Sequence, residues 1–222
     1  MKRFVQCLII LCSINCLNAQ PKSLKSEKMY MNVDTIYFPS RLSGLSLAML
    51  YSQATNPHDD YPVLMLHGSS FPSSLAFAFR MDGTSWMDQI SQAGLDVYAL
   101  DFLGYGNADR YPEMKTSNFS GNAPGRAADV VIDVERAVRE IIQRTKKTKV
   151  YLIAHSWGGT VATLYAERYP QQVEKLILFA AITPRNLPPT IEEVKSDFHM
   201  LTPGQRVQQM MELAPIGQNH LL

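Results

Sequence analysis

Cysteine is nearly missing from this chain of 222 residues, and all three cysteines, Cys7, Cys12 and Cys16, lie close to the N-terminus. Downstream of them, neither a disulfide nor a cysteine-based metal site can form. A surplus of charge is missing as well, because the formal net charge is +1 and the Lys and Arg residues are scattered along the chain. This balance excludes the electrostatic signature of a nucleic-acid or anionic-membrane partner.

The chain also has no hydrophobic run long enough to span a membrane. Its first apolar run, residues 4–17, is interrupted by Gln6, Ser13 and Asn15, whereas a spanning helix needs about 20 mainly apolar residues. Basic residues precede the run and Ala19 offers a small residue for cleavage. The pattern predicts a secretory signal peptide over residues 1–19 and a secreted or periplasmic protein, with a membrane-anchored leader as the alternative.

The remaining sequence is typical of one globular unit, with 46% hydrophobic and 18% charged residues overall. Near its start, two alternating segments predict an antiparallel pair of strands, over residues 31–38 and 47–51. From Tyr61 onward, short unbroken apolar runs separated by helical patterns predict a parallel sheet covered on both faces. The predicted parallel strands are residues 63–66, 97–100, 150–154 and 176–180.

Helix signals separate these strands. The predicted helices begin at Thr84 or Ser85 and end at Gly94, cover residues 127–142, and cover residues 158–169. Beyond Pro184, capping-box patterns at Thr190 and Thr202 predict two short amphipathic helices.

One segment, KVYLIAHSWGGTVA (residues 149–162), passes from a predicted strand through a serine into a predicted helix. A serine hydroxyl is a poor nucleophile, so an enzyme that uses one must expose it, supply a base and stabilise the oxyanion. A tight turn between strand and helix exposes Ser156 if its neighbours are small. Ala154, Gly158 and Gly159 meet this condition, which makes Ser156 a candidate nucleophile.

The residues AHSWG resemble the G-x-S-x-G nucleophile elbow of the α/β-hydrolase superfamily, with Ala154 in place of the first Gly. Two further segments are similar to motifs of this family and follow in the expected order. MLHGSS (residues 65–70) resembles its His-Gly turn, and YALDFLGYGNADR (residues 98–110) resembles its D-x-x-G-x-G-x-S segment, with Asn107-Ala108 where Ser is commoner. The resemblance covers about residues 31–183.

The resemblance implies an α/β-hydrolase fold: a mostly parallel sheet with helices on both faces, incomplete at the C-terminus. It divides the chain into the leader (residues 1–19), the hydrolase core (20–183) and the start of a helical lid (184–222). It implies a catalytic role for Ser156 and an oxyanion hole formed by the backbone N–H groups of Ser69 and Trp157. No metal and no organic cofactor is implied.

Other polar residues near these motifs have structural interpretations. His67 is expected to be a hydrogen-bonding histidine of the turn and not the catalytic base. Asp101 is expected to organise a turn. The side chain of His155 is expected to point away from that of Ser156.

The rest of a catalytic triad is not evident. The family order is Ser, then Asp or Glu, then His, but no acid-then-histidine arrangement on later strands follows Ala181. His199 and His220 both fall in the helical stretch. The chain is therefore expected to be a truncated hydrolase with little activity of its own.

The preferred function is hydrolysis of a small-molecule carboxylic ester, or of an amide, through an acyl-enzyme on Ser156. Family members that act as epoxide hydrolases or dehalogenases carry Asp at the elbow, and peptidase members usually show HGGPG where this chain has HGSSF. The rival hypothesis is a catalytically inactive hydrolase-like binding protein. Coding sequence beyond Leu222 discriminates between the two, and the substrate cannot be read from these residues.

Overall fold

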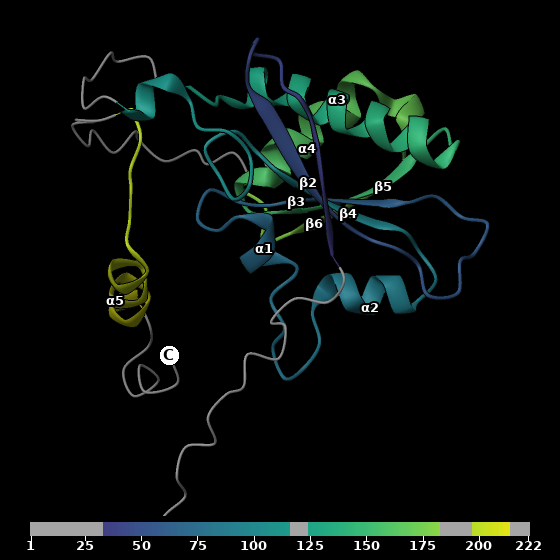
Figure 1. The fold of residues 1–222 in the computed structure, drawn as a ribbon, viewed down its shortest axis with the longest axis horizontal. Coiled ribbons are helices and arrows are strands. Elements are labelled where there is room, and N and C mark those ends of the chain that lie inside the picture. The colour runs from purple at the N-terminus through teal and green to yellow at the C-terminus, as the bar shows by residue number, and fades with distance from the viewer. Residues whose placement is uncertain (1–32, 116–123, 183–196, 214–222) are drawn as a thin grey trace, which may run out of the picture.

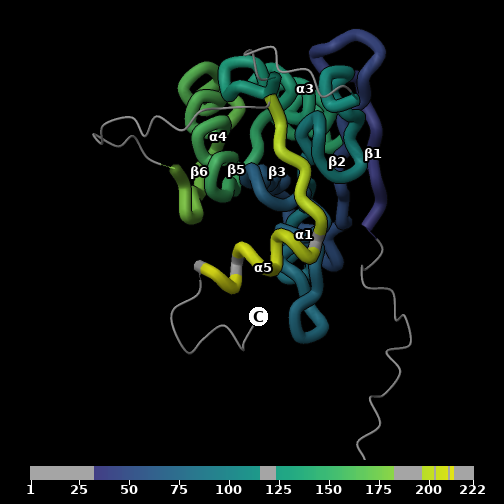
Figure 2. Tube along the Cα trace, turned by 90° about the vertical axis from the view of Figure 1, so that its left-hand side faces the viewer, coloured from purple at the N-terminus to yellow at the C-terminus, as the bar shows by residue number. Residues whose placement is uncertain are grey.

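The computed structural model describes residues 33–115, 124–182 and 197–213. These residues form a six-stranded sheet with the order β1-β2-β4-β3-β5-β6 (Figures 1 and 2). The strands are β1 (Asp34–Pro39), β2 (Ser46–Ser52), β3 (Val63–Leu66), β4 (Val97–Asp101), β5 (Val150–His155) and β6 (Val173–Phe179). β1, β2 and β4 pair antiparallel, while β4, β3, β5 and β6 run parallel to one another. The predicted fold class is confirmed.

Helices cover both faces of the sheet. α1 (Ser73–Ala76) and α2 (Trp86–Gln92) lie on one face, and α3 (Ala127–Thr145) and α4 (Trp157–Arg168) lie on the other (Figure 1). Two short 3₁₀ helices, η1 (Pro112–Lys115) and η2 (Pro170–Gln172), lie in the connections. α5 (Pro203–Leu213) stands outside this layered core. No helix within the described ranges is long and apolar enough to cross a membrane.

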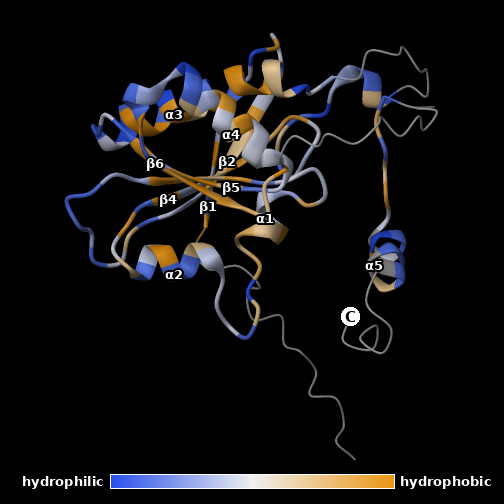
Figure 3. Cartoon of the chain, turned by 180° about the vertical axis from the view of Figure 1, so that it is seen from behind, coloured by the Kyte–Doolittle hydropathy of each residue, from blue (hydrophilic) through white to orange (hydrophobic). Residues whose placement is uncertain are grey.

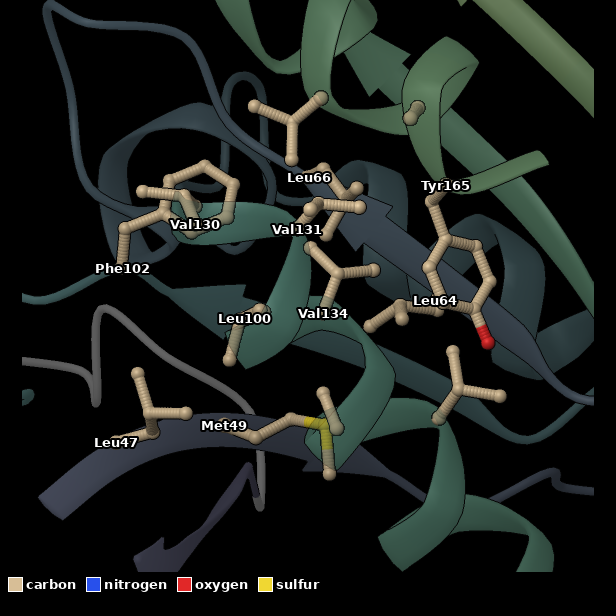
Figure 4. Packing of buried hydrophobic residues seen from close by; sticks show 14 of the residues in the cluster. Leu47, Met49, Leu64, Leu66, Leu100, Phe102, Val130, Val131, Val134 and Tyr165 are labelled. Carbon is tan, nitrogen blue, oxygen red and sulfur yellow. The ribbon is translucent and has the colours of Figure 1, made fainter. Parts of the chain in front are cut away.

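The sheet separates two apolar layers because neighbouring strand residues point to opposite faces. In β3, Leu64 and Leu66 belong to the cluster under α3 and α4, while Val63 and Met65 belong to the cluster over α2. Figure 3 shows the same division, with hydrophobic strands in the middle and hydrophilic outer helix surfaces. In Figure 4, Leu64 and Leu66 lie beside the valines of α3. Burying each such side chain contributes about 1.5–3 kcal/mol.

Most predicted boundaries agree with these elements to within one or two residues. Three differ by three residues: β1 begins later than predicted, α3 ends later, and β6 begins earlier. The Ser85 side chain caps α2 in a reciprocal capping box with Asp88. Thr202 caps α5, since its Oγ1 accepts from the Gln205 N–H at 3.3 Å. The predicted helix after Thr190, the leader with its three cysteines, and His220 lie outside the described residues.

Candidate active site

The backbone of Ser156 turns sharply between β5 and α4. Its φ is 53° and its ψ is −123°, a conformation that costs a residue with a side chain on the order of 1–3 kcal/mol. Hydrogen bonds hold the turn, because the Ser156 N–H donates to the Phe179 carbonyl at 3.0 Å and the Ser156 carbonyl accepts from Gly159 at 2.9 Å. The strained turn therefore places Ser156 at the carboxyl end of the parallel strands, as the elbow pattern predicts.

Small residues allow the His-Gly turn to lie directly against this serine. A Cβ atom on Gly68 would be 2.9 Å from Ser156 Cβ and 3.3 Å from its Oγ. A Cβ atom on Gly158 would be 2.5 Å from the carbonyl oxygen of His67. Neither position accepts a side chain without a shift of the backbone around Ser156.

His67 is a fully buried, neutral histidine that holds this turn. Its Nδ1 lies 2.6 Å from the Gly68 carbonyl oxygen, and the Phe102 N–H donates to its Nε2 at 3.3 Å. The Phe102 bond leaves Nε2 without a proton, so Nδ1 carries the proton and donates to Gly68. Burial lowers the pKa of His67 and keeps the ring neutral. The prediction of a structural histidine is confirmed.

The bond from His67 also controls the direction of the Ser69 amide. The Gly68 carbonyl and the Ser69 N–H belong to the same planar peptide group, so fixing the oxygen fixes the N–H on the opposite side. A second side chain, Tyr105, donates its hydroxyl to the Ser69 carbonyl at 2.9 Å. Sequence reasoning missed this contribution of Tyr105. The first peptide group is thus held by His67, to which Phe102 donates, and the second by Tyr105 from the loop that follows β4.

The amides of Ser69 and Trp157 have no hydrogen-bond acceptor within the described part of the chain. Trp157 begins α4, directly after Ser156, and its ring packs against Phe102 with centroids 5.5 Å apart. Unpaired amides on either side of a serine are the groups that an oxyanion hole requires. The assignment of these two amides to an oxyanion hole stays a prediction.

Asp101 organises the neighbouring loops, as predicted. Its buried carboxylate accepts hydrogen bonds from the Ser73 N–H at 2.8 Å and the Asn107 N–H at 2.9 Å. A Cβ atom on Gly106 would overlap this carboxylate, at 2.0 Å from Oδ2. Asp101 thus joins the start of α1 to the loop after β4 and is engaged in backbone contacts.

Ser156 opens into a small cavity of about 240 Å³. We refer to it as the serine cavity; its walls are Gly68, Ser69, Ser70, Phe71, Leu75, Ala76, Phe77, Trp86, His155, Ser156 and Phe179. A second cavity of about 830 Å³, the large cavity, lies on the side of Trp157 and Tyr105. The two cavities share Ser69, Ser70, Phe71 and Leu75 as lining residues. The two cavities therefore adjoin at these residues.

The expected direction of His155 is wrong. His155 lines the serine cavity together with Ser156, and its ring packs against Phe179 with centroids 5.4 Å apart. Successive side chains alternate only along a regular strand. The positive φ of Ser156 interrupts that alternation and brings both side chains to one cavity.

The described residues supply no evident triad partner for Ser156. No Asp or Glu lines the serine cavity. His199 lines the large cavity instead, and no hydrogen bond joins it to Ser156 in the described part of the chain. No group of three or more potential metal-ligating side chains occurs among the described residues either.

Comparisons with known proteins agree with this geometry. A family profile described as "alpha/beta hydrolase fold" matches residues 61–215. Epoxide hydrolase 1 of Caenorhabditis elegans is 29% identical over 141 residues, which are 62% of this chain and 29% of that protein. A proline iminopeptidase of Chitinophaga pinensis is 28% identical over 116 residues, 52% of this chain and 33% of that protein. The chain thus spans a third or less of the length of these two curated relatives.

Solved structures show the same fold. A thioesterase domain from the curacin biosynthetic pathway matches with a TM-score of 0.53 and 17% identity, over 72% of this chain and 48% of that one. A 2-hydroxy-6-oxo-6-phenylhexa-2,4-dienoate hydrolase from Rhodococcus sp. strain RHA1 matches with a TM-score of 0.50 and 18% identity, over 71% of this chain and 50% of that one. At such identities the likeness concerns the fold alone.

Proposed function

Because this chain belongs to the alpha/beta hydrolase family, we propose that it carries the nucleophile of a serine hydrolase that cleaves carboxylic esters through an acyl-enzyme on Ser156. The observation that carries the proposal is the strained backbone of Ser156, with φ at 53°, at the wall of a cavity. Strain of this kind persists where the surrounding structure requires a particular presentation of the side chain.

The chemistry assigns each group a role. Ser156 Oγ attacks the ester carbonyl, the carbonyl oxygen becomes negatively charged, and the amides of Ser69 and Trp157 donate to it. The ester C–O bond then breaks, the alcohol leaves with the proton taken from Ser156, and water later releases the acid from the acyl-enzyme. His67 and Tyr105 act on this step only by holding the Ser69 peptide in position. The proton of Ser156 needs a base, which we assign to a residue outside the described part of the chain.

A serine at the elbow position favours ester hydrolysis over the activity named for the epoxide hydrolases among the relatives. Family members with that activity carry Asp at the elbow, whose carboxylate attacks directly. A serine there forms an acyl-enzyme from an ester or amide instead.

We also propose that the protein is secreted or periplasmic. This proposal rests on the sequence pattern of residues 1–19 alone.

Fluorophosphonate labelling tests the proposal. These probes phosphonylate serines that act as nucleophiles, so we expect a labelled protein whose label disappears in Ser156→Ala. Ser70→Ala is the matched control, because Ser70 lines the same cavity and has no assigned role. Labelling that persists in Ser156→Ala and is lost in Ser70→Ala contradicts the proposal.

The inactive hydrolase-like binding protein remains the second candidate, since no described acid or histidine is hydrogen-bonded to Ser156. Loss of triad partners lowers turnover by a factor of about 10⁴ to 10⁶. This second candidate predicts negligible hydrolysis of p-nitrophenyl acetate and, at most, labelling of Ser156 over hours, because no base would activate the hydroxyl. A complete lack of Ser156 labelling at saturating probe favours the binding protein.

A further inference from the structure

The large cavity combines apolar walls with an excess of positive charge. Its apolar lining includes Phe102, Met114, Val130, Trp157 and Val207. Its charged lining consists of three cations and one carboxylate: Arg110, Lys115, Arg206 and Asp197. A cavity that only held an apolar group would gain nothing from cations in its wall, because partial desolvation of a charge is costly.

The three cationic side chains differ in the hydrogen bonds and ion pairs that they already form within the protein. The guanidinium of Arg110 donates to carbonyl oxygens of its own loop, including that of Gly106 at 3.0 Å. It therefore acts as part of the loop. Lys115 and Arg206 form no ion pair with any residue in the described ranges. Among the described residues, these two side chains carry positive charge without a carboxylate partner.

Arg206 stands near the wall that joins the two cavities. Its Cζ lies 6.0 Å from the ring centroid of Phe71, and Phe71 lines both cavities. Burial raises the pKa of the Tyr105 hydroxyl, and the positive charge of Arg206 opposes this rise. Arg206 and Tyr105, which donates to the Ser69 carbonyl, both line the large cavity. The other contact of Arg206 is a hydrogen bond to Gln209 at 3.1 Å, which leaves further N–H donors for a ligand.

We propose that the substrate is an ester whose apolar body carries a carboxylate, and that Arg206, supported by Lys115, binds this carboxylate in the large cavity. The inference rests on the proposed function, which places the ester group at Ser156. A guanidinium offers two parallel N–H donors to a carboxylate, and apolar walls strengthen this pairing. The half-ester of a linear dicarboxylic acid is the simplest such molecule.

Tryptophan fluorescence measures this binding without any catalysis. The chain has two tryptophans: Trp86 lines the serine cavity and Trp157 the large cavity. In a Trp86→Phe protein, Trp157 is therefore the reporter of the large cavity. Titration with monomethyl suberate and with dimethyl suberate compares one apolar body with and without a carboxylate. We expect monomethyl suberate to bind about ten-fold more tightly, with the difference shrinking as salt is added.

Substitutions in the same background identify the partner of the carboxylate. Arg206→Gln is expected to remove the preference for monomethyl suberate, and Arg206→Lys to retain part of it. Lys115→Gln should also reduce the preference. Because Lys115 lies in η1 and not in α5, this result does not depend on whether α5 shifts in the Arg206 variants. Arg168→Gln is the matched control, since Arg168 is exposed at the end of α4 and lines neither cavity.

Equal affinity for the two suberate esters overturns the inference, and so does a preference that survives the combined Arg206→Gln and Lys115→Gln substitutions. Ser156→Ala should leave both affinities unchanged. Failure of the proposed function is thereby separated from failure of this inference, because lost labelling at Ser156 concerns the chemistry and the suberate titration concerns the cavity.

Discussion

His67 connects the turn beside Ser156 to the end of β4, and it does so only as a neutral ring. Its protonation would place a proton on Nε2, where the Phe102 N–H already donates. The same contacts predict how stability depends on pH. The pKa of His67 is lowered from its ordinary value of 6.5, mainly by burial. The unfolded chain therefore takes up this proton at a higher pH than the folded chain does.

The stability that this neutral His67 contributes is fully present above pH 6.5 and is lost as the pH falls below that value. We expect the free energy of unfolding to fall by up to about 1.4 kcal/mol per pH unit through this group. Urea unfolding between pH 7 and pH 5 measures the effect. His67→Asn should show a shallower dependence, and His58→Asn, at an exposed position, should follow the unsubstituted protein. Equal slopes for His67→Asn and the unsubstituted protein would refute the assignment.

Gly158 tests how tightly the elbow is packed. Alanine normally favours a helix relative to glycine, but a Cβ atom here would meet the carbonyl oxygens of His67 and Leu66 at 2.5 and 2.6 Å. We expect Gly158→Ala to lower stability by about 1–3 kcal/mol. Gly204→Ala in α5 is the matched control, because its Cβ atom would meet nothing within 4 Å. A neutral or stabilising effect of Gly158→Ala in urea unfolding would show that the elbow adapts easily.

At the scale of elements, a buried ion pair joins the turn after β1 to α3. The Asp133 carboxylate accepts from the Arg41 backbone N–H at 2.7 Å and also binds its guanidinium. The exposed fractions of the two side chains are 12% for Arg41 and 1% for Asp133. Burial raises the pKa of Asp133 against the opposing effect of Arg41. Removing Arg41 alone would therefore leave a buried carboxylate without its counter-charge.

We expect Arg41→Met to lower the free energy of unfolding by about 3–5 kcal/mol. A double variant that also carries Asp133→Leu should recover much of this loss, because no buried charge remains. Arg139→Met breaks an exposed ion pair with Glu135 on α3 and should change stability little. Equal effects of Arg41→Met and Arg139→Met on thermal unfolding would show that the buried pair contributes no more to stability than the exposed pair does.

Some of these elements could be predicted from local patterns in the sequence, and others could not. β3 and the starts of β4 and β5 follow from unbroken apolar runs. The apolar run predicts the start of β6 too late, because Glu174 and Lys175 interrupt it. A strand at the edge of a sheet accommodates such exposed charges. α1 was missed because its four residues are too few to show helical periodicity.

The candidate site, too, could be predicted only in part from the sequence. The elbow and the His-Gly turn depend on residue types at fixed spacing, so the sequence predicts Ser156, Ser69 and Trp157 together. It does not point to Tyr105 or Arg206, since each forms its contact with a residue more than thirty positions away or on another element. Such contacts have no local pattern.

At the scale of the whole molecule, β6 is the outer strand of the sheet within the described ranges, and it carries exposed apolar side chains. The exposed fractions of Ile177, Leu178 and Phe179 are 50%, 46% and 53%. Adjacent apolar side chains on an edge strand favour association between molecules. We expect the 222-residue chain to self-associate as its concentration rises, and Ile177→Lys to reduce this. Ile132→Lys on α3, at a site with a similar exposed fraction of 44%, should not. A monomer at all concentrations in sedimentation velocity would contradict this expectation.

Peptide mapping after fluorophosphonate treatment tests the central claim, that Ser156 is the nucleophile, most directly. Trypsin should release residues 150–168 as one peptide, because no Lys or Arg lies between Lys149 and Arg168. The account predicts that the added phosphonyl mass is found on this peptide and that fragmentation places it on Ser156. Phosphonyl mass on the peptide that contains Ser69 and Ser70, with residues 150–168 unmodified, would contradict it.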